Sequence, residues 1–542
     1  MPRILVVEDD ADQREIRRLI LERSGHTVQS AACSSDALAH VDAHDSDCVL
    51  MDLRIPRPSD GLQLIQDIRA RDARLPVVVL SGWPEDLEKS PVAGAVSATL
   101  KKPVATDRLL RTINRLLLAM TLLLFCCGMS KGQSRSFPFQ VAQGGEVLAE
   151  LTMSSPGSDW AVAGKEGALA AITVDAQPAH HLMVTGPERT YRIFLGRLAA
   201  GPHSIKVERQ AGDSAAGAGL SVTAARFENS NSDFIANAPI VLARLNTLGK
   251  FTDVPLMAYC TRGQDADGSF LEYTVIFTNE DGGTSTRDLM ARWGRTTDIE
   301  YIYRVWLDAS GKPKKTLIQT KGHEDVPYNG IRIGSHPVLM PVTDNNMVEP
   351  AAANASRLRY QLTPVLADLS DGSREKVMDA APFTYEIASK ELQREGKLRP
   401  FGTFEGENIS DPRNYLVVEL KVNSTLAGVQ VLIQRKGEKK WRGSALGLGK
   451  DFIERSGWVR TRVELPPGTT PSDLAGFGAE CLSQRDLVRQ PIAKNGHCAV
   501  EAIGRVFFLD QEYKPGPRIA IPGFPAGGWK MEAGELFTLA LQ

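Results

Sequence analysis

The stretch Arg3-Ile-Leu-Val-Val-Glu-Asp-Asp10 decides the fold of the front of this chain. A short run of apolar, largely β-branched residues ends in acids, and residues 13–23 then carry leucines and isoleucines at helical spacing. An apolar run of this length is typical of a buried strand, and the spacing behind it is typical of an amphipathic helix. The order therefore predicts a strand, an acidic loop and a helix.

The same unit recurs further along the chain. Cys48-Val-Leu-Met-Asp52 precedes a turn with Pro56, Pro58 and Gly61, and a helix is predicted over 62–71. Pro76-Val-Val-Val-Leu-Ser81 reads as another buried strand. Strands that alternate with helices predict a parallel, doubly wound α/β sheet.

Acids, a hydroxyl and a lysine follow the predicted strands. The carboxyl ends of parallel strands face one crevice, so Glu8, Asp9, Asp52 and Ser81 are expected at one rim, and Lys102 joins them after the next strand. Crowded carboxylates repel one another, which favours a hard cation such as Mg²⁺. Any one of these acids alone would read as a solvated loop residue, but together they form a set suited to phosphoryl transfer.

These residues resemble the receiver domain of two-component response regulators over residues 1–118. The matching motifs are Glu8-Asp9, Arg14, Asp52-Leu-Arg-Ile-Pro56, Ser81-Gly82, Ala93-Gly94-Ala95 and Lys102-Pro103. The resemblance implies a five-stranded sheet in a bacterial, cytoplasmic signalling domain that catalyses its own phosphorylation and dephosphorylation. A histidine kinase or a phosphotransfer protein would be its partner.

The resemblance also implies a role for each site residue. Asp52 would accept the phosphoryl group, and Ser81 and Lys102 would contact its oxygens. Glu8, Asp9 and Asp52 would hold Mg²⁺ together with the backbone carbonyl of Arg54. One departure concerns Thr99, which stands where the family usually has an aromatic residue that reports phosphorylation.

An apolar run over residues 116–128 follows the receiver-like part, within a junction placed at 119–135. Its length of about 13 residues falls short of the roughly 20 that span a bilayer and suits the core of a signal peptide. Three interpretations stay open. The run is a membrane anchor with the remainder outside, or an extended soluble helix, or the trace of a secreted-protein gene joined to a receiver gene.

Behind the junction, short strand-like runs separated by turn residues predict a β-rich region. We expect a small β-sandwich over 136–225, a mixed, mainly β domain over 226–400 and a β-rich domain over 401–542. Two further features have two interpretations each. Asp298, Glu300, His323 and Asp344 form a site or simply occupy turns, and Cys481 and Cys498 form a disulfide or remain buried thiols.

Composition limits the function classes. The net charge is −2, so no long-range positive field favours nucleic acid, and no helix-turn-helix pattern follows residue 118. No catalytic motif assigns an enzyme class to the rear part. The sequence thus indicates a phosphorelay response regulator with an unidentified β-rich output region, which has a carbohydrate or a protein as its expected ligand. The alternative is an exported β-rich carbohydrate-binding protein or hydrolase fused to a passenger receiver.

Overall fold

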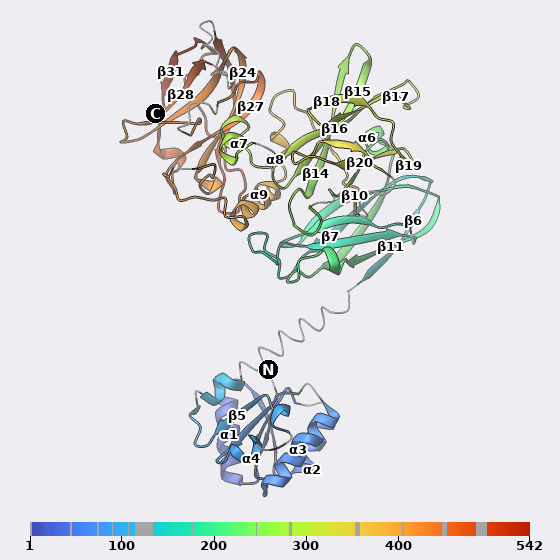
Figure 1. Ribbon diagram of the computed structural model, residues 1–542, viewed down its shortest axis with the longest axis vertical. Helices are drawn as coiled ribbons and strands as arrows, with labels where there is room; N and C mark the ends of the chain where they lie inside the picture. The colour runs from blue at the N-terminus through green and yellow to red at the C-terminus, as the bar shows by residue number, and fades with distance from the viewer. Residues whose placement is uncertain are drawn as a thin grey trace. The chain divides into compact units, whose positions relative to one another are not determined.

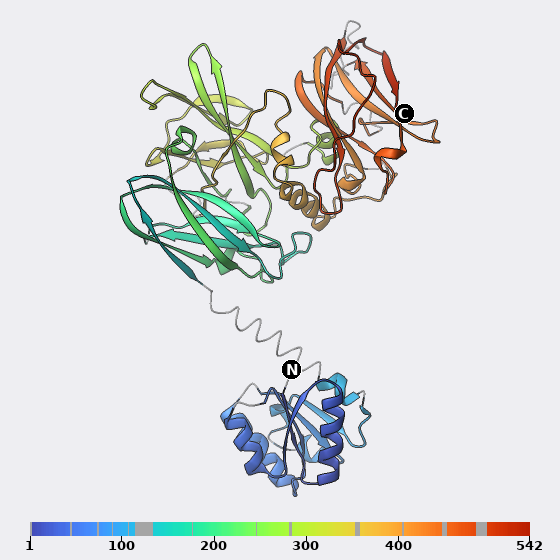
Figure 2. The ribbon, with the colours of Figure 1, turned by 180° about the vertical axis from the view of Figure 1, so that it is seen from behind.

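The computed structural model describes residues 3–43, 46–72, 75–88, 90, 92–106, 108–113, 134–175, 177–244, 247–280, 284–352, 358–403, 406–446, 452–483 and 496–541. The chain forms two compact units, Met1–Lys131 and Gly132–Gln542 (Figures 1 and 2). The apolar run 116–128 lies outside the described residues. None of the helices in the described ranges combines the length and apolar character that crossing a bilayer requires.

The first unit is the expected doubly wound α/β fold. Its described residues form a parallel five-stranded sheet in the order β2-β1-β3-β4-β5. The strands are β1 (Arg3–Val7), β2 (Thr27–Ala31), β3 (Cys48–Asp52), β4 (Val77–Ser81) and β5 (Ala98–Lys101). The helices are α1 (Ala11–Arg23), α2 (Ser34–Asp42), α3 (Pro58–Arg71), α4 (Glu85–Glu88) and the 3₁₀ turn η1 (Ala93–Ala95).

Alternate residues of the central strands enter two different hydrophobic cores. Leu5 and Val49 pack on one face with Leu64 of α3, and the same core contains residues of α2. Val6 and Leu50 pack on the other face with Leu21 of α1, and with Leu109 and Ile113. A strand buried on both faces reads as a continuous apolar run, which is the pattern the sequence shows.

The second unit is built from several antiparallel or mixed sheets. In its described part, β10 (Arg189–Leu198), β7 (Gly145–Ser154) and β12 (Ser221–Ser230) form a three-stranded sheet. A nine-stranded sheet contains β19 (Arg332–Ile333), β20 (His336–Pro341), β13 (Ile240–Leu242), β22 (Arg359–Tyr360), β9 (His180–Val184), β8 (Ala168–Val174), β11 (Gly201–Arg209) and β6 (Arg135–Val141), with β21 (Val348–Pro350) paired to β20. A six-stranded sheet contains β18 (Glu324–Pro327), β17 (Pro313–Thr320), β16 (Ile299–Leu307), β15 (Gly268–Phe277), β14 (Pro255–Asp265) and β23 (Val365–Leu366).

These three sheets share one hydrophobic core. The three-stranded sheet contributes Leu151 to it, the nine-stranded sheet contributes Ile172 and the six-stranded sheet contributes Tyr273. The boundary expected at residue 225 cuts through the nine-stranded sheet, because β13 pairs with both β20 and β22, and β22 continues the sheet beyond β9. Residues on both sides of that boundary therefore belong to one sheet. Without β22, the β9 edge would present unpaired backbone groups.

The last part of the chain is a β-sandwich. Within the described residues, one four-stranded sheet has the order β27 (Gly457–Glu464), β24 (Tyr415–Thr425), β29 (His497–Phe508) and β30 (Trp529–Glu532). The other has the order β26 (Trp441–Gly443), β25 (Ala427–Arg435), β28 (Leu474–Ser483) and β31 (Leu536–Ala540). Their inner faces share a core, which also contains Cys481 and Cys498 as a disulfide. Of the two interpretations of Cys481 and Cys498, a disulfide or buried thiols, the structure has the disulfide.

Short helices complete the second unit. They are α6 (Asp233–Ala236), α7 (Thr286–Arg292), α8 (Lys376–Asp379) and α9 (Phe383–Arg394), with 3₁₀ turns η2 (Ala211–Asp213), η4 (Pro412–Asn414) and η5 (Pro471–Asp473). Pro382 stands at the N-cap of α9 and follows the end of α8. Both helices pack between the six-stranded sheet and the β24 sheet, where Ile276, Met378, Tyr385 and Val417 share a core.

At Gly61, α3 approaches the backbone that follows β3 too closely to leave room for a side chain. A Cβ at this position would lie 2.0 Å from the carbonyl oxygen of Leu53, whereas a Cβ at Gly82 would meet nothing within 4 Å. We predict that Gly61→Ala destabilises the receiver sheet by about 1–3 kcal/mol, since overpacking forces the backbone to shift. Hydrogen exchange of the β3 amides in the full chain measures this, with Gly82→Ala as the matched control. Equal exchange in both variants would contradict the prediction.

Candidate functional site

Asp52 lies at the carboxyl end of β3, beside a lysine from the end of the sheet. Lys102 Nζ is 2.6 Å from Asp52 Oδ2 and 3.4 Å from Glu8 Oε2. Lys102 is held there because its backbone N–H donates to the carbonyl of Ser81 at 2.9 Å. Of the residues expected at one rim, which were Glu8, Asp9, Asp52, Ser81 and Lys102, the structure brings the side chains of Glu8, Asp52 and Lys102 into contact and joins Ser81 to Lys102 through the backbone.

Arg17, which was not predicted from the sequence, is buried on the inner side of α1 and forms an ion pair with Glu8. Burial lowers the pKa of the Arg17 guanidinium, and the charge of Asp52 opposes that shift. Glu8 is only 2% exposed, so its charge needs a partner inside the protein. One feature of the sequence could have indicated this buried arginine. Arg17 stands four residues before Leu21, on the face that an amphipathic helix turns to the core.

The other expected site residues surround this pair. Ser81 is buried, and its Oγ accepts from the N–H of Trp83 at 3.0 Å. Arg54 donates its backbone N–H to Asp52 Oδ1 at 3.4 Å. The Arg54 side chain lies over the Trp83 ring at 4.1 Å and pairs with Asp86 at 2.9 Å. Oδ1 of Asp52 is thus the less engaged of its two carboxylate oxygens.

The rim offers oxygen donors that suit a hard cation. Asp9 is exposed, and Arg14 fixes the loop by donating to the carbonyls of Glu8 at 2.6 Å and Asp9 at 3.2 Å. In the described ranges, no three His, Cys, Asp or Glu side chains gather closely enough to hold a metal. Mg²⁺ usually takes one or two protein carboxylates and keeps several waters. The expected set of Glu8, Asp9 and Asp52 is thus not gathered around one point, and Glu8 is already paired with two cations. The two remaining carboxylates and the Arg54 carbonyl are oxygen donors of the kind that Mg²⁺ takes.

The four candidate residues of the rear part do not form one site. Asp298 is fully buried and its Oδ2 accepts from Asn346 at 2.9 Å, while Asp344 is exposed and pairs with Arg244. Burial, followed by the charges of Glu300 and Glu280, raises the pKa of Asp298 well above its ordinary value. His323 is exposed in a turn with φ 61°. The turn interpretation therefore accounts for His323 and Asp344.

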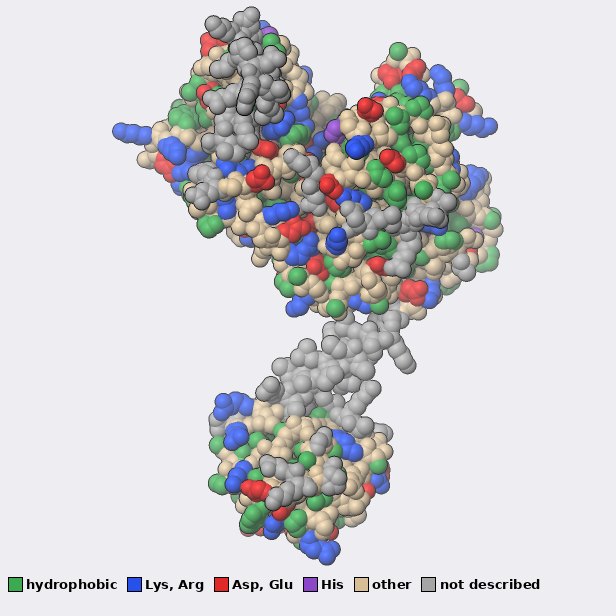
Figure 3. All heavy atoms as spheres, viewed as in Figure 1, with side chains coloured by type: hydrophobic (Ala, Val, Ile, Leu, Met, Phe, Trp, Pro, Cys, Tyr) green, Lys and Arg blue, Asp and Glu red, His purple; other side chains and the backbone are tan. Residues whose placement is uncertain are grey.

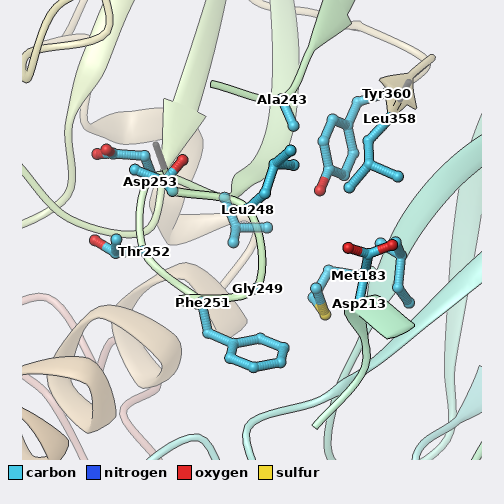
Figure 4. A pocket seen from close by; sticks show the side chains of 13 residues that line it. Met183, Asp213, Ala243, Leu248, Gly249, Phe251, Thr252, Asp253, Leu358 and Tyr360 are labelled. Atoms are coloured by element: carbon cyan, nitrogen blue, oxygen red, sulfur yellow. The ribbon is translucent and has the colours of Figure 1, made fainter. Parts of the chain in front are cut away.

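A closed cavity near the Phe251 loop is too small for an organic ligand. Figure 4 shows Leu248, Phe251, Asp253 and Tyr360 around it. Its volume of about 20 Å³ holds a single water. On the face of the second unit visible in Figure 3, basic and acidic side chains are interspersed, so this face presents no extended basic surface for nucleic acid.

Glu391 on α9 is a buried acid outside any open site. Its Oε2 accepts from Trp160 Nε1 at 2.9 Å and its Oε1 accepts from Thr278 Oγ1 at 3.2 Å. Burial raises the pKa of Glu391 from 4.5 to about 8, although Arg394 opposes this shift. The folded protein therefore keeps a proton that the unfolded chain releases between these two pH values, and stability falls as the pH rises through this window.

We predict that Glu391→Gln removes this loss of stability. The free energy of unfolding of the variant should exceed that of the natural protein by a margin that grows from pH 5 to pH 8, by more than about 1 kcal/mol. Urea unfolding of the full chain at several pH values measures it. The exposed Glu349→Gln is the control and should leave the pH dependence unchanged. The prediction would be contradicted if the free energy of unfolding of Glu391→Gln fell with rising pH as steeply as that of the natural protein.

Residues 4–114 match the family described as the response regulator receiver domain. The C4-dicarboxylate transport transcriptional regulatory protein DctD of Rhizobium meliloti is 32% identical over 115 residues, which are 21% of this chain and 25% of that protein. The virulence transcriptional regulatory protein PhoP of Salmonella typhimurium is 40% identical over 91 residues, 16% of this chain and 40% of PhoP. This chain spans less than half the length of either relative.

Solved structures of response regulator proteins also match about a fifth of the chain. A receiver domain protein from Clostridium thermocellum is 23% identical and covers 23% of this chain and 99% of that one, with a TM-score of 0.22. The response regulator TrrA from Thermotoga maritima, in complex with Mg²⁺ and BeF, is 24% identical and covers 21% and 99%, with a TM-score of 0.20. By the family match, residues 4–114 of this chain are a receiver domain of the two-component response regulators.

Proposed function

We propose that Asp52 accepts a phosphoryl group from a histidine kinase or a phosphotransfer protein. The ion pair between Lys102 Nζ and Asp52 Oδ2, at 2.6 Å, is the observation that carries this proposal. It holds one carboxylate oxygen and leaves Oδ1 for attack on phosphorus. The O–P bond forms as the N–P bond to the donor imidazole breaks, and the imidazole nitrogen leaves with the electron pair.

The neighbouring groups then stabilise the product. Lys102 can exchange one Asp52 oxygen for a phosphoryl oxygen without leaving the rim, because its stem is long and flexible. The buried Ser81 hydroxyl supplies a second donor at the end of the adjacent strand. Asp9, Asp52 and the Arg54 carbonyl would hold Mg²⁺, which when bound neutralises phosphoryl oxygens. Catalysis here consists of positioning and charge compensation.

We predict that Asp52→Asn abolishes labelling of the full chain by acetyl phosphate, because the amide has no nucleophilic oxygen of comparable charge. Intact-mass measurement detects one added phosphoryl group in the natural protein and none in the variant. EDTA should block labelling of the natural protein as well. Asp12→Asn, an exposed residue of α1, is the matched control and should label normally. Full labelling of Asp52→Asn would refute the assignment.

A separate prediction concerns the effect of Arg17 on the affinity for Mg²⁺. Its positive charge lies against Glu8 and is coupled to Asp52, so it competes with a divalent cation at the same rim. Arg17→Met should therefore bind Mg²⁺ more tightly, on the order of tenfold. Isothermal titration of the full chain with MgCl₂ measures the affinity, and Asp9→Ala should lose it. Unchanged or weaker binding in Arg17→Met would show that the guanidinium does not oppose the metal.

We also propose that the second unit functions in an oxidising compartment, as the exported alternative requires. The observation that favours this is the disulfide between Cys481 and Cys498, whose Cα atoms are 5.7 Å apart in the sandwich core. Disulfides persist in extracytoplasmic environments and are rare in the cytosol. The receiver, which depends on a kinase, is proposed to remain cytoplasmic, and tethering through 116–128 would connect the two.

This location predicts the thiol state of the protein in cells. When cells are lysed in a maleimide reagent, the exposed Cys33 should be modified, while Cys481 and Cys498 should react only after reduction and unfolding. Peptide mass spectrometry reads each thiol separately, and Cys33 serves as the internal control. Modification of Cys481 and Cys498 after unfolding without any reductant would show that the pair is reduced, and would contradict an oxidising location.

A further inference from the structure

Two arginines of the second unit line an open cavity without donating a hydrogen bond. The cavity has a volume of about 420 Å³ and is lined by Arg374, Arg455, Trp458 and Ser456, among others. In the part of the chain that the structure describes, the Nε atoms of both guanidinium groups are buried and have no hydrogen-bond acceptor. Cavities of this size accommodate small organic ligands.

Both charged residues of the described cavity lining are arginines, and the carboxylate nearest to them, Glu375, is buried and does not line the cavity. Glu375 is the shared partner of Arg374 at 3.7 Å, Arg455 at 3.9 Å and Arg295 at 3.3 Å. Although burial acts to raise it, Arg455, Arg374, Arg295 and Arg460 lower the pKa of Glu375 to about 2. Burial, together with neighbouring arginines, lowers the pKa of Arg455 to about 10. Burial acts to lower the pKa of Arg374, and the charges of Glu375, Glu300 and Asp298 raise it. Glu375 nevertheless lies beyond hydrogen-bond distance of Arg374 and Arg455, which leaves guanidinium donors for an external anion.

A second cavity adjoins the first and shares Arg455. It has a volume of about 220 Å³ and is lined by Arg292, Trp293, Glu454 and Arg455. The ring of Trp293 lies under Arg292 at 4.5 Å and Arg455 at 5.5 Å. Glu454 pairs with Arg292 at only 3.5 Å, so its carboxylate can also accept from a ligand hydroxyl. The two cavities together therefore offer guanidinium donors, a hydroxyl acceptor and half-buried indole rings.

We propose that these cavities bind an acidic oligosaccharide, with a sugar carboxylate on Arg374 and Arg455. The planar guanidinium matches a carboxylate in a bidentate arrangement. Glu454 would accept from sugar hydroxyls, which an inorganic anion lacks, and Trp458 or Trp293 would pack against a ring face. A nucleic acid is disfavoured, since the net charge is −2 and the arginines form one local cluster.

Isothermal titration of the full chain with a panel of tri-uronates, composed of galacturonate, mannuronate or guluronate, tests this proposal. At least one should bind with a Kd in the micromolar to low millimolar range, and the neutral trisaccharide galactotriose should not bind. Arg455→Gln and Arg374→Gln should each weaken the uronate by about tenfold or more, as expected for the loss of a charged hydrogen-bond partner. Arg518→Gln, an exposed arginine of the same unit, is the matched control and should leave the affinity unchanged.

Arg455→Lys separates binding from folding, since it keeps the charge while losing the planar fork. We expect a smaller loss of affinity than in Arg455→Gln and an unchanged circular dichroism spectrum. The proposal is overturned if no tri-uronate binds at millimolar concentration, or if galactotriose binds equally. Sodium sulfate that binds as tightly as the uronates would show an anion site without sugar recognition. Full affinity in both glutamine variants would place the ligand elsewhere and would likewise overturn it.

Discussion

A carboxyl group that leaves water must either keep its proton or be matched by cations, and this constraint organises both units. Glu8 is 2% exposed and is paired with Arg17 and Lys102, so the same lysine that neutralises it also reaches Asp52. A buried ion pair adds little net stability, because desolvation offsets the Coulomb attraction. Removing one partner is costly, however, so such a pair fixes geometry. The receiver rim is positioned by this requirement as much as by its hydrophobic cores.

The same requirement positions the arginines of the second unit. Arg460 on β27 is fully buried, pairs with Asp379 at 2.7 Å and Glu419 at 3.0 Å, and donates to the backbone carbonyl of Glu375 at 3.2 Å. These contacts tie α8 to the β24 sheet. Arg374 precedes Glu375 in the chain, so its place at the cavity follows from this attachment. The network thus fixes the backbone next to Arg374, whose Nε lies 3.7 Å from the Glu375 carboxylate, beyond hydrogen-bond distance.

The sequence predicted the receiver almost completely because each of its signals is local. A buried parallel strand is an apolar run, and an acid or a hydroxyl directly after it must lie at the rim, as Asp52 and Ser81 do. Arg17 was not predicted because Glu8, its ion-pair partner, lies next to it only when α1 packs on the sheet. The sheet that crosses residue 225 was missed for a related reason, since two-residue strands such as β22 carry no periodicity.

The sequence could not predict the arginine cavities, because their arginines come from distant parts of the chain. Arg292 lies on α7, Arg374 in the turn before α8 and Arg455 in the segment just before β27. In the sequence, each of these arginines taken by itself looks like an ordinary surface residue. Their meeting depends on how α7 and α8 pack on the β24 sheet, through cores that contain Met290 and Met378. Long-range packing therefore decides where this charge gathers. A site built in this way persists only while the sheets that flank α8 remain associated, so ligand affinity and the stability of that interface should be coupled.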